Sequence, residues 1–152
     1  MTLDIDDDHD DSSGKWIHMV NTRSMRYYHS HAVKEGRILL IGGYYSRSTK
    51  WIAVDGSPSQ PGPFDVRHGP WHCTIQLSAN SILVTGGPDT NEYVTKVTKY
   101  ELSDGKETPL TPMLQSRSHH RCGVYQDAAG QQVRSDCSKF ELINLDDDID
   151  SL

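Results

Sequence analysis

Histidine is the residue type that most readily suggests chemistry in this sequence. Eight histidines occur among the 152 residues. His29 and His31 would share one face of a strand, because strand side chains alternate with a period of two. Zinc would require about four ligands in a tetrahedral array, yet the sequence contains no C-x-x-C or H-E-x-x-H motif. We therefore expect no metal site and interpret the histidines as structural residues of turns, with metal binding as the alternative.

Other catalytic chemistry lacks an organising motif. Serine, histidine and aspartate are plentiful, but no G-x-S-x-G nucleophile elbow or cysteine–histidine motif brings them together. The pair Gly42-Gly43 lacks the G-x-x-x-x-G-K-[ST] spacing of a phosphate-binding loop. We expect a protein that is not an enzyme, with no catalytic residues and no cofactor.

The three cysteines, Cys73, Cys122 and Cys137, are few and irregularly spaced. Small domains that are built on disulfides have more cysteines, usually in even number. We expect buried free thiols, and keep a redox or metal role as the alternative.

Two loops contain residue types that suit recognition of a partner protein. Tyrosine and arginine, which occur together in the first loop, are enriched at the hot spots of interfaces. Loops that follow the strands of a rigid scaffold often carry recognition. We expect these loops to bind a partner, with ordinary exposed loops as the alternative. The candidate residues are Tyr44, Tyr45, Arg47, Asp89, Asn91 and Glu92.

The strands that must position these loops are predicted by two apolar runs, residues 37–41 and 81–85. Each run ends in a diglycine, and the diglycines begin 44 residues apart, at Gly42 and Gly86. An internal repeat of about 40–50 residues in a pattern of strands indicates propeller blades. Because the runs show no polar alternation, we expect these strands to be buried on both faces.

The repeat extends beyond the diglycines. His29 precedes the first diglycine by 13 residues, and His72 precedes the second by 14. Third strands are expected over residues 50–55 and 93–102, each followed by a polar turn and a short fourth strand rich in proline. Aromatic residues of the third strands would fill the contacts between blades; these are Trp51, Tyr93 and Tyr100.

A third copy of the repeat begins with Arg117 and His120, which preserve the R-x-x-H spacing of Arg26 and His29. Buried polar side chains in proteins are usually hydrogen-bonded. We expect these arginines and histidines to bond backbone carbonyls in the turns that join one blade to the next.

Together these features, over residues 16–133, resemble the Kelch repeat family. A Kelch blade carries an arginine and a histidine ahead of its first strand, a second strand ending in Gly-Gly, an aromatic third strand and an outer fourth strand. The tryptophan that usually follows the third strand is missing from the second repeat, where residues 107–110 read Glu-Thr-Pro-Leu. The residues that match the motif are Arg26, His29, Gly42, Gly43, His72, Gly86, Gly87, Arg117 and His120.

The resemblance implies an all-β fold, an incomplete Kelch-type β-propeller of four-stranded antiparallel blades. It also implies a non-enzymatic protein–protein interaction module, a scaffold or adaptor such as those of ubiquitin ligases or of actin. The alternative is a remnant of a galactose-oxidase-like metalloenzyme propeller domain. Some members of that wider superfamily bind copper with tyrosine and histidine, but Tyr27, Tyr28 and His29 lie too close together in sequence for such a site.

The expected order of domains follows from this resemblance. Closed propellers have about four to eight blades, whereas this chain supplies about three. We expect a fragment of a larger propeller protein, with a ring completed by self-association and an open array as alternatives. The expected segments are an acidic disordered tail (1–14), Kelch repeats (15–133) and a divergent strand with an acidic tail (134–152). The repeats comprise an outer strand (15–20), a blade (24–66), a second blade (67–113) and a partial blade (114–133).

Charge separates the two ends of the chain from its body. The formal net charge is −6, yet six aspartates lie in residues 1–11 and four in residues 146–152. The body between them holds all 15 basic residues against 11 acidic ones. Ends of such charge density are expected to be poorly ordered, with calcium binding as the alternative, although the spacing of an EF-hand loop is absent. Because the body has no basic cluster, we expect no nucleic acid partner.

Membrane and export signals are also missing from the sequence. No apolar run approaches the roughly 18 residues of a membrane span, and the mean hydropathy is −0.63. The first residues lack the basic and apolar regions of a signal peptide. We expect a cytoplasmic protein that does not associate with membranes and that binds a protein partner or further copies of itself.

Overall fold

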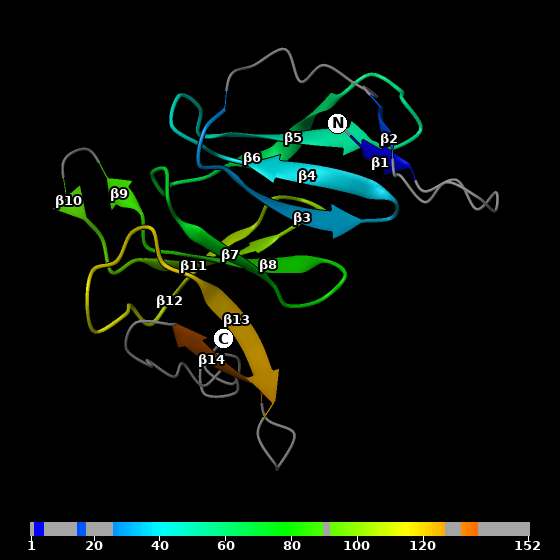
Figure 1. Cartoon of the computed structure of the whole chain (residues 1–152). Helices are drawn as coiled ribbons and strands as arrows, with labels where there is room; N and C mark the ends of the chain where they lie inside the picture. The colour runs from blue at the N-terminus through cyan, green and yellow to red at the C-terminus, as the bar shows by residue number, and fades with distance from the viewer. Residues whose placement is uncertain (1, 5–14, 18–25, 90–91, 127–131, 137–152) are drawn as a thin grey trace.

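The computed structural model describes residues 2–4, 15–17, 26–89, 92–126 and 132–136, and every regular element in them is a β-strand (Figure 1). Two four-stranded antiparallel sheets form the centre of the molecule. The first consists of β3 (Ser30–Lys34), β4 (Arg37–Ile41), β5 (Ser48–Ala53) and β6 (Gln60–Asp65). The second consists of β7 (Cys73–Gln76), β8 (Ser81–Thr85), β11 (Val97–Glu101) and β12 (Glu107–Leu110).

The two sheets confirm the all-β prediction and its four-stranded antiparallel units. In each sheet the strands pair in chain order, and the two sheets lie within the expected blades, residues 24–66 and 67–113. The β3–β4 turn shows how the sequence shapes them: Glu35 and Gly36 both have positive φ, at 50° and 69°, as two-residue hairpin turns of type I′ require. No closed sheet is formed by the described residues.

Three two-stranded pairs complete the described elements. β13 (Cys122–Gln126) pairs with β14 (Gln132–Asp136), and β9 (Pro88–Asp89) pairs with β10 (Glu92–Tyr93). β1 (Thr2–Asp4) pairs with β2 (Lys15–Ile17). β13 lies where the first strand of the partial blade was expected.

The N-terminal pair differs from the sequence expectation. β1 lies in a segment expected to be a disordered tail, and β2, expected to be the outer strand of a preceding blade, pairs with β1 instead. Alternation of polar and apolar residues in Thr2–Asp4 permits this pairing despite the neighbouring aspartates. Residues 140–145, for which a further strand was considered, lie outside the described residues.

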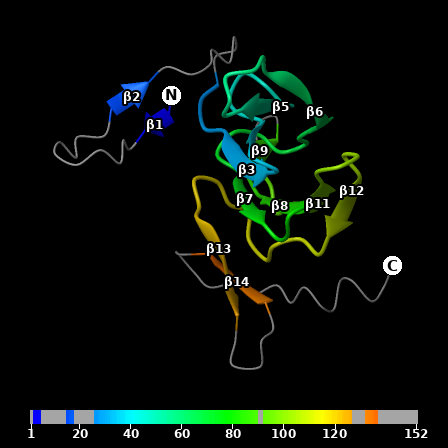
Figure 2. The same ribbon diagram turned by 90° about the vertical axis from the view of Figure 1, so that its right-hand side faces the viewer.

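The larger core cluster lies between the two sheets, which are stacked one above the other in both views (Figures 1 and 2). Full burial of a side chain such as Leu39 or Ile82 contributes roughly 1.5–3 kcal/mol relative to exposure. Every residue of β8 is buried, as the apolar run predicted. For β4 the same prediction is wrong, because only Leu39 and Ile41, on the face toward the second sheet, are buried. The cluster comprises Ala32, Leu39, Ile41, Trp51 and Val66 from the first sheet and its loops, and Ile82, Val84, Tyr100 and Leu102 from the second.

A second apolar cluster lies on the opposite face of the second sheet. Ile75, Leu83, Val97 and Met113 are buried there, and Cys122 of β13 packs against them. The β13–β14 hairpin therefore covers part of this face, so that the first sheet, the second sheet and the hairpin follow one another (Figure 2).

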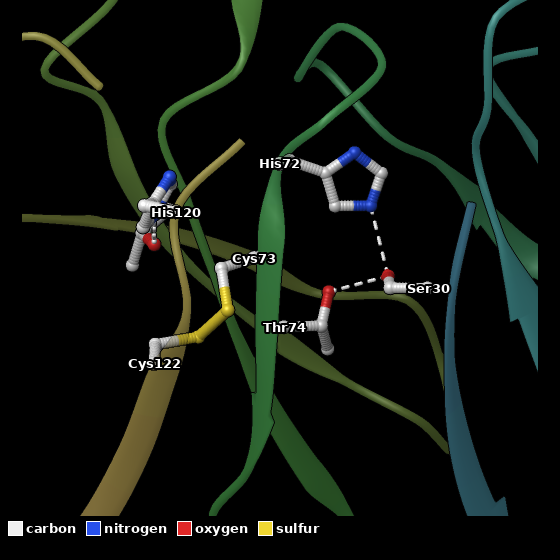
Figure 3. The surroundings of a disulfide bond; sticks show 7 residues. Ser30, His72, Cys73, Thr74, His120 and Cys122 are labelled. Atoms are coloured by element: carbon white, nitrogen blue, oxygen red, sulfur yellow. Dashed lines mark hydrogen bonds between the residues drawn. A yellow bond between two sulfur atoms is a disulfide. The ribbon is translucent and has the colours of Figure 1, made fainter. Parts of the chain in front are cut away.

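The cysteines correct the expectation of free thiols. Cys73 of β7 and Cys122 of β13 form a disulfide, with Cα atoms 6.1 Å apart (Figure 3). Their separation of 49 residues in the sequence gave no signal, because the stacking of the hairpin on the second sheet is what brings them together. Cys137 lies outside the described residues.

Candidate functional site

The repeated histidines and diglycines are in contact with each other across neighbouring repeats. A Cβ atom at Gly42 would lie 3.1 Å from Cε1 of His72, and one at Gly86 would lie 2.7 Å from Cε1 of His120. The first glycine of each diglycine thus leaves room for the histidine of the following repeat. This contact gives a physical reason for the spacing that the sequence shows.

Hydrogen bonds show that these histidines link the repeats (Figure 3). The Nδ1 atom of His72 lies 2.7 Å from the Gly69 carbonyl oxygen, and its Nε2 lies 2.8 Å from the Ser30 hydroxyl. Since a carbonyl only accepts, Nδ1 donates and Nε2 of the neutral ring accepts from Ser30. In the next repeat, Nε2 of His120 lies 2.8 Å from the Thr85 hydroxyl. The arrangement supports a structural role for both histidines.

Burial favours the neutral form of two of the repeated histidines, His72 and His29, by lowering their pKa. Desolvation is the main cause that lowers the pKa of His72, and the nearby His120 and His29 lower it further, against a raising contribution from the bond to Gly69. Desolvation also lowers the pKa of His29. Neutral imidazoles are able to bind metals, but among the described residues no group of three or more histidine, cysteine, aspartate or glutamate side chains gathers.

Arg26 binds backbone carbonyls, as expected, but not in a turn that joins two blades. Its Nη1 donates to the carbonyl oxygens of Gly42, at 3.2 Å, and Ser48, and its Nη2 donates to the Ser48 hydroxyl at 2.8 Å. These acceptors lie in the β4–β5 loop of its own sheet and at the start of β5. In the third repeat, the carbonyl of the buried Arg117 accepts a bond from the Gly87 amide at 2.9 Å.

Three ring-bearing residues immediately before the repeated histidines adopt a left-handed backbone. Tyr28, Trp71 and His119 have φ of 56°, 60° and 55°. This region is uncommon for residues with a side chain and costs on the order of 1–3 kcal/mol each. We call these residues the ring triad. Their recurrence at one position of the repeat makes the conformation a feature of the fold.

The ring triad brings side chains of three repeats together. The ring centroids of Tyr28 and Trp71 lie 4.9 Å apart, and Trp71 stacks on His119 at 4.4 Å. The backbone joins them in the same order: the Trp71 amide donates to the Tyr28 carbonyl at 3.3 Å, and the His119 amide donates to the Trp71 carbonyl at 3.1 Å.

Two tyrosines of the β4–β5 loop extend this cluster. The Tyr44 ring lies edge-on to Trp71 at 5.7 Å and to Tyr45 at 4.8 Å, and Tyr45 lies 5.9 Å from Tyr27. The Tyr44 amide donates to the Tyr27 carbonyl at 2.8 Å. Unlike the buried Trp51 and Tyr100, these tyrosines are open to solvent, with Tyr44 50% and Tyr45 68% exposed.

A pocket of about 610 Å³ lies among these rings. Three loops form it, those that follow β4, β6 and β8. It is lined by Gly43, Tyr44, Tyr45, Ser46, Arg47, Gly69, Pro70, Trp71 and Pro88. We refer to it as the aromatic pocket.

The structure brings together some of the predicted site residues. Tyr44, Tyr45 and Arg47 line the aromatic pocket. Asp89 and Glu92 pair in the β9–β10 hairpin, next to the pocket residue Pro88. Asn91 lies outside the described residues.

Sequence reasoning missed the contribution of Trp71 and Pro70, and of the ring triad as a whole. The signal that was present is positional: an aromatic or histidine residue stands directly before each of the repeated His29, His72 and His120. The arrangement offers apolar ring faces, tyrosine hydroxyls and one guanidinium, with no carboxylate in the described lining. Such a surface binds by stacking and hydrogen bonding.

Neither a protein-family model nor a curated protein matches this sequence. Within the described residues, no helix is long and apolar enough to cross a membrane.

Proposed function

We propose that this chain is a non-enzymatic protein-interaction module of the Kelch type, and that it binds a partner protein at the aromatic pocket. The observation that carries the proposal is the group of exposed tyrosines beside Trp71, around a pocket formed by three loops. Soluble proteins bury most large rings, so a pocket rimmed by exposed ones suits binding.

The energetics of interfaces support this proposal. Tyrosine, tryptophan and arginine are enriched among the residues that dominate binding, and truncation of such a residue commonly costs more than about 1 kcal/mol. The backbone bonds that join Tyr44 to Tyr27 and Trp71 to Tyr28 hold the rings in place before a partner arrives. A surface ordered in advance loses less conformational entropy on binding.

The Kelch assignment draws support from the internal repeat and from two four-stranded sheets that face one another across a shared core. The alternative, a galactose-oxidase-like metalloenzyme domain, has no comparable observation in its favour: the described residues include no cluster of potential metal ligands.

The proposal is tested by cross-linking and affinity capture with the full chain. Wild type and the Tyr44→Ala/Tyr45→Ala variant are compared. Val54→Ala is the control, because Val54 is also exposed but follows the end of β5, whereas the two tyrosines precede its start. We expect the double variant to lose captured partners by about tenfold or more, while the control and the thermal unfolding curves remain unchanged.

Two results would contradict the proposal. One is partner capture that is equal for wild type and the double variant. The other is stoichiometric copper in the purified chain together with oxidase turnover, which would favour the metalloenzyme.

A further inference from the structure

The geometry points to a redox-sensitive switch at the disulfide between β7 and β13 (Figure 3). We propose that a dithiol reductant opens the Cys73–Cys122 bond and thereby releases the β13–β14 hairpin from the second sheet. Oxidation of the two thiols returns the hairpin to the sheet. Neither cysteine lines the aromatic pocket, so the switch is independent of the proposed function.

The first support is the isolation of the hairpin from the other sheets. Among the described strands, β13 and β14 pair only with each other, so no backbone ladder joins them to the second sheet. A two-stranded hairpin alone is marginally stable in water. The position of this hairpin therefore depends on side-chain contacts and on the disulfide.

The second support is the limited packing between the hairpin and the second sheet. Cys122 is the one described hairpin residue that packs against the cluster around Leu83. Val124 shares the face of Cys122, because strand side chains alternate, yet it is 39% exposed. A Cβ atom at Gly123 would meet no atom within 4 Å. The larger core cluster, in contrast, contains side chains of both four-stranded sheets.

The third support is the place where the chain stops being bonded to the second sheet. Immediately before the hairpin, Nε2 of His120 lies 2.8 Å from the Thr85 hydroxyl of β8. A single exposed residue, Arg121, stands between His120 and Cys122. Opening the disulfide would therefore leave the chain attached as far as His120 and free the hairpin to move as a unit about Arg121.

Thiol–disulfide exchange supplies the chemistry of the switch. A thiolate of the dithiol attacks one sulfur of the bond and forms a mixed disulfide, while the other cysteine leaves as a thiolate and takes up a proton. The second thiol of the dithiol then loses its proton, attacks the mixed disulfide and releases the first cysteine in the same way. Two electrons and two protons pass to Cys73 and Cys122, and the dithiol ends as a disulfide. Both cysteines are only partly buried, so a reductant can reach the bond.

Release of the hairpin changes the surface of the second sheet. The apolar face beneath the hairpin contains Ile75, Leu83, Val97 and Met113. Part of this face would be open to solvent in the reduced chain and covered in the oxidised chain. The switch thus controls exposure of an apolar surface.

The test is hydrogen–deuterium exchange of the full chain, measured by mass spectrometry before and after treatment with dithiothreitol. Alkylation after each treatment counts the free thiols. We expect the amides of β13 and β14 to lose protection by about tenfold or more on reduction, while the amides of β8 remain protected. Removal of the reductant and renewed oxidation should restore the protection of the hairpin.

Two variants serve as controls. Cys73→Ser/Cys122→Ser should show the fast exchange of the hairpin without reductant and should not respond to it. Cys137→Ser leaves the bond intact and should respond as wild type does.

Three results would overturn the inference. One is unchanged exchange of the hairpin when alkylation shows that all three cysteines are reduced. Another is loss of protection in β8 together with the hairpin, because the disulfide would then stabilise the whole fold and not one element. The third is a disulfide that dithiothreitol does not reduce while the chain is folded.

Discussion

At the scale of single residues, the molecule uses histidine to connect its repeats. His72 contacts Gly42 of the first sheet and bonds Ser30 of β3, whose hydroxyl lies 2.6 Å from that of Thr74. One repeat later, His120 contacts Gly86 in the same manner, but its hydrogen bond is to Thr85, the residue before that glycine. A buried imidazole that must accept a hydrogen bond cannot be protonated without loss of that bond, so the bond between His72 and Ser30 depends on pH.

We predict that the free energy of unfolding falls as the pH is lowered from about 7.5 to about 5. The fold lowers the pKa of His72 and of His29 below the usual value near 6.5, which the unfolded chain retains. Below that pH the unfolded chain therefore binds more protons than the folded chain, and stability declines until the folded histidines also titrate. Urea unfolding at a series of pH values measures this.

The control for this prediction is His72→Asn, which removes one titrating group. Its stability should be lower overall but should vary less with pH across the same interval. A wild-type free energy that stays flat between pH 7.5 and pH 5 would refute the prediction, as would an unchanged slope in the variant.

At the scale of elements, the β13–β14 hairpin is joined to the second sheet by both packing and a covalent bond. Cys122 packs with the cluster around Leu83 and is bonded to Cys73 of the neighbouring β7. A disulfide lowers the conformational entropy of the unfolded chain, and this stabilising effect increases with the length of the loop that the disulfide closes. For a separation of 49 residues, the entropic contribution is about 4 kcal/mol.

We predict that the Cys73→Ser/Cys122→Ser variant loses up to about 4 kcal/mol of unfolding free energy. Urea unfolding followed by circular dichroism measures the loss, and a reducing agent should produce a similar shift in wild type. Cys137→Ser serves as the matched control and should unfold as wild type does. Titration of three free thiols in the folded wild-type chain would show that the disulfide is absent.

The elements themselves were largely predictable from the sequence, because local signals specify them. The apolar runs before Gly42 and Gly86 became β4 and β8, and β8 is buried on both faces. The disulfide and the ring triad were not predictable. Cysteine spacing carries no information about which hairpin will stack on which sheet, and no side-chain type marks Trp71 or Tyr28 for a left-handed backbone. Both features depend on contacts between repeats.

The candidate site was predictable in part for the same reason. The loop after β4 was predictable as a binding site, because it follows a recognisable strand and contains residue types common at interfaces, namely Tyr44, Tyr45 and Arg47. Trp71 sits between β6 and β7, where its exposure and its partners depend on the neighbouring sheet. The aromatic pocket is likewise lined by residues from several segments of the chain.

At the scale of the whole molecule, the two sheets differ in what covers their equivalent faces. Ile38 and Ile82 each lie four residues before the first glycine of their diglycine, and Ile82 is fully buried between the sheets. By strand alternation and register, Ile38 shares the outer face of the first sheet with Val33 and Ile52, and Val33 is 49% exposed. An apolar sheet face of this kind favours association.

We predict that the chain self-associates through this outer face and that Ile38→Lys weakens the association. Sedimentation velocity over a range of concentrations measures it. A lysine there would place a charge in the contact, which is costly without a partner charge. Leu114→Lys is the matched control, because Leu114 is 90% exposed and its replacement should leave the association unchanged. A wild-type chain that remains monomeric at every concentration would refute the prediction.

The disulfide between Cys73 and Cys122 also closes a covalent loop in the chain. Strands β8, β11 and β12 all lie between these two residues in the chain, so almost the whole second sheet is enclosed in a closed covalent ring. A protease that cuts the exposed turn at Lys106 would therefore open the ring without releasing a fragment. After such a cut, the two parts of the chain would remain joined through the disulfide.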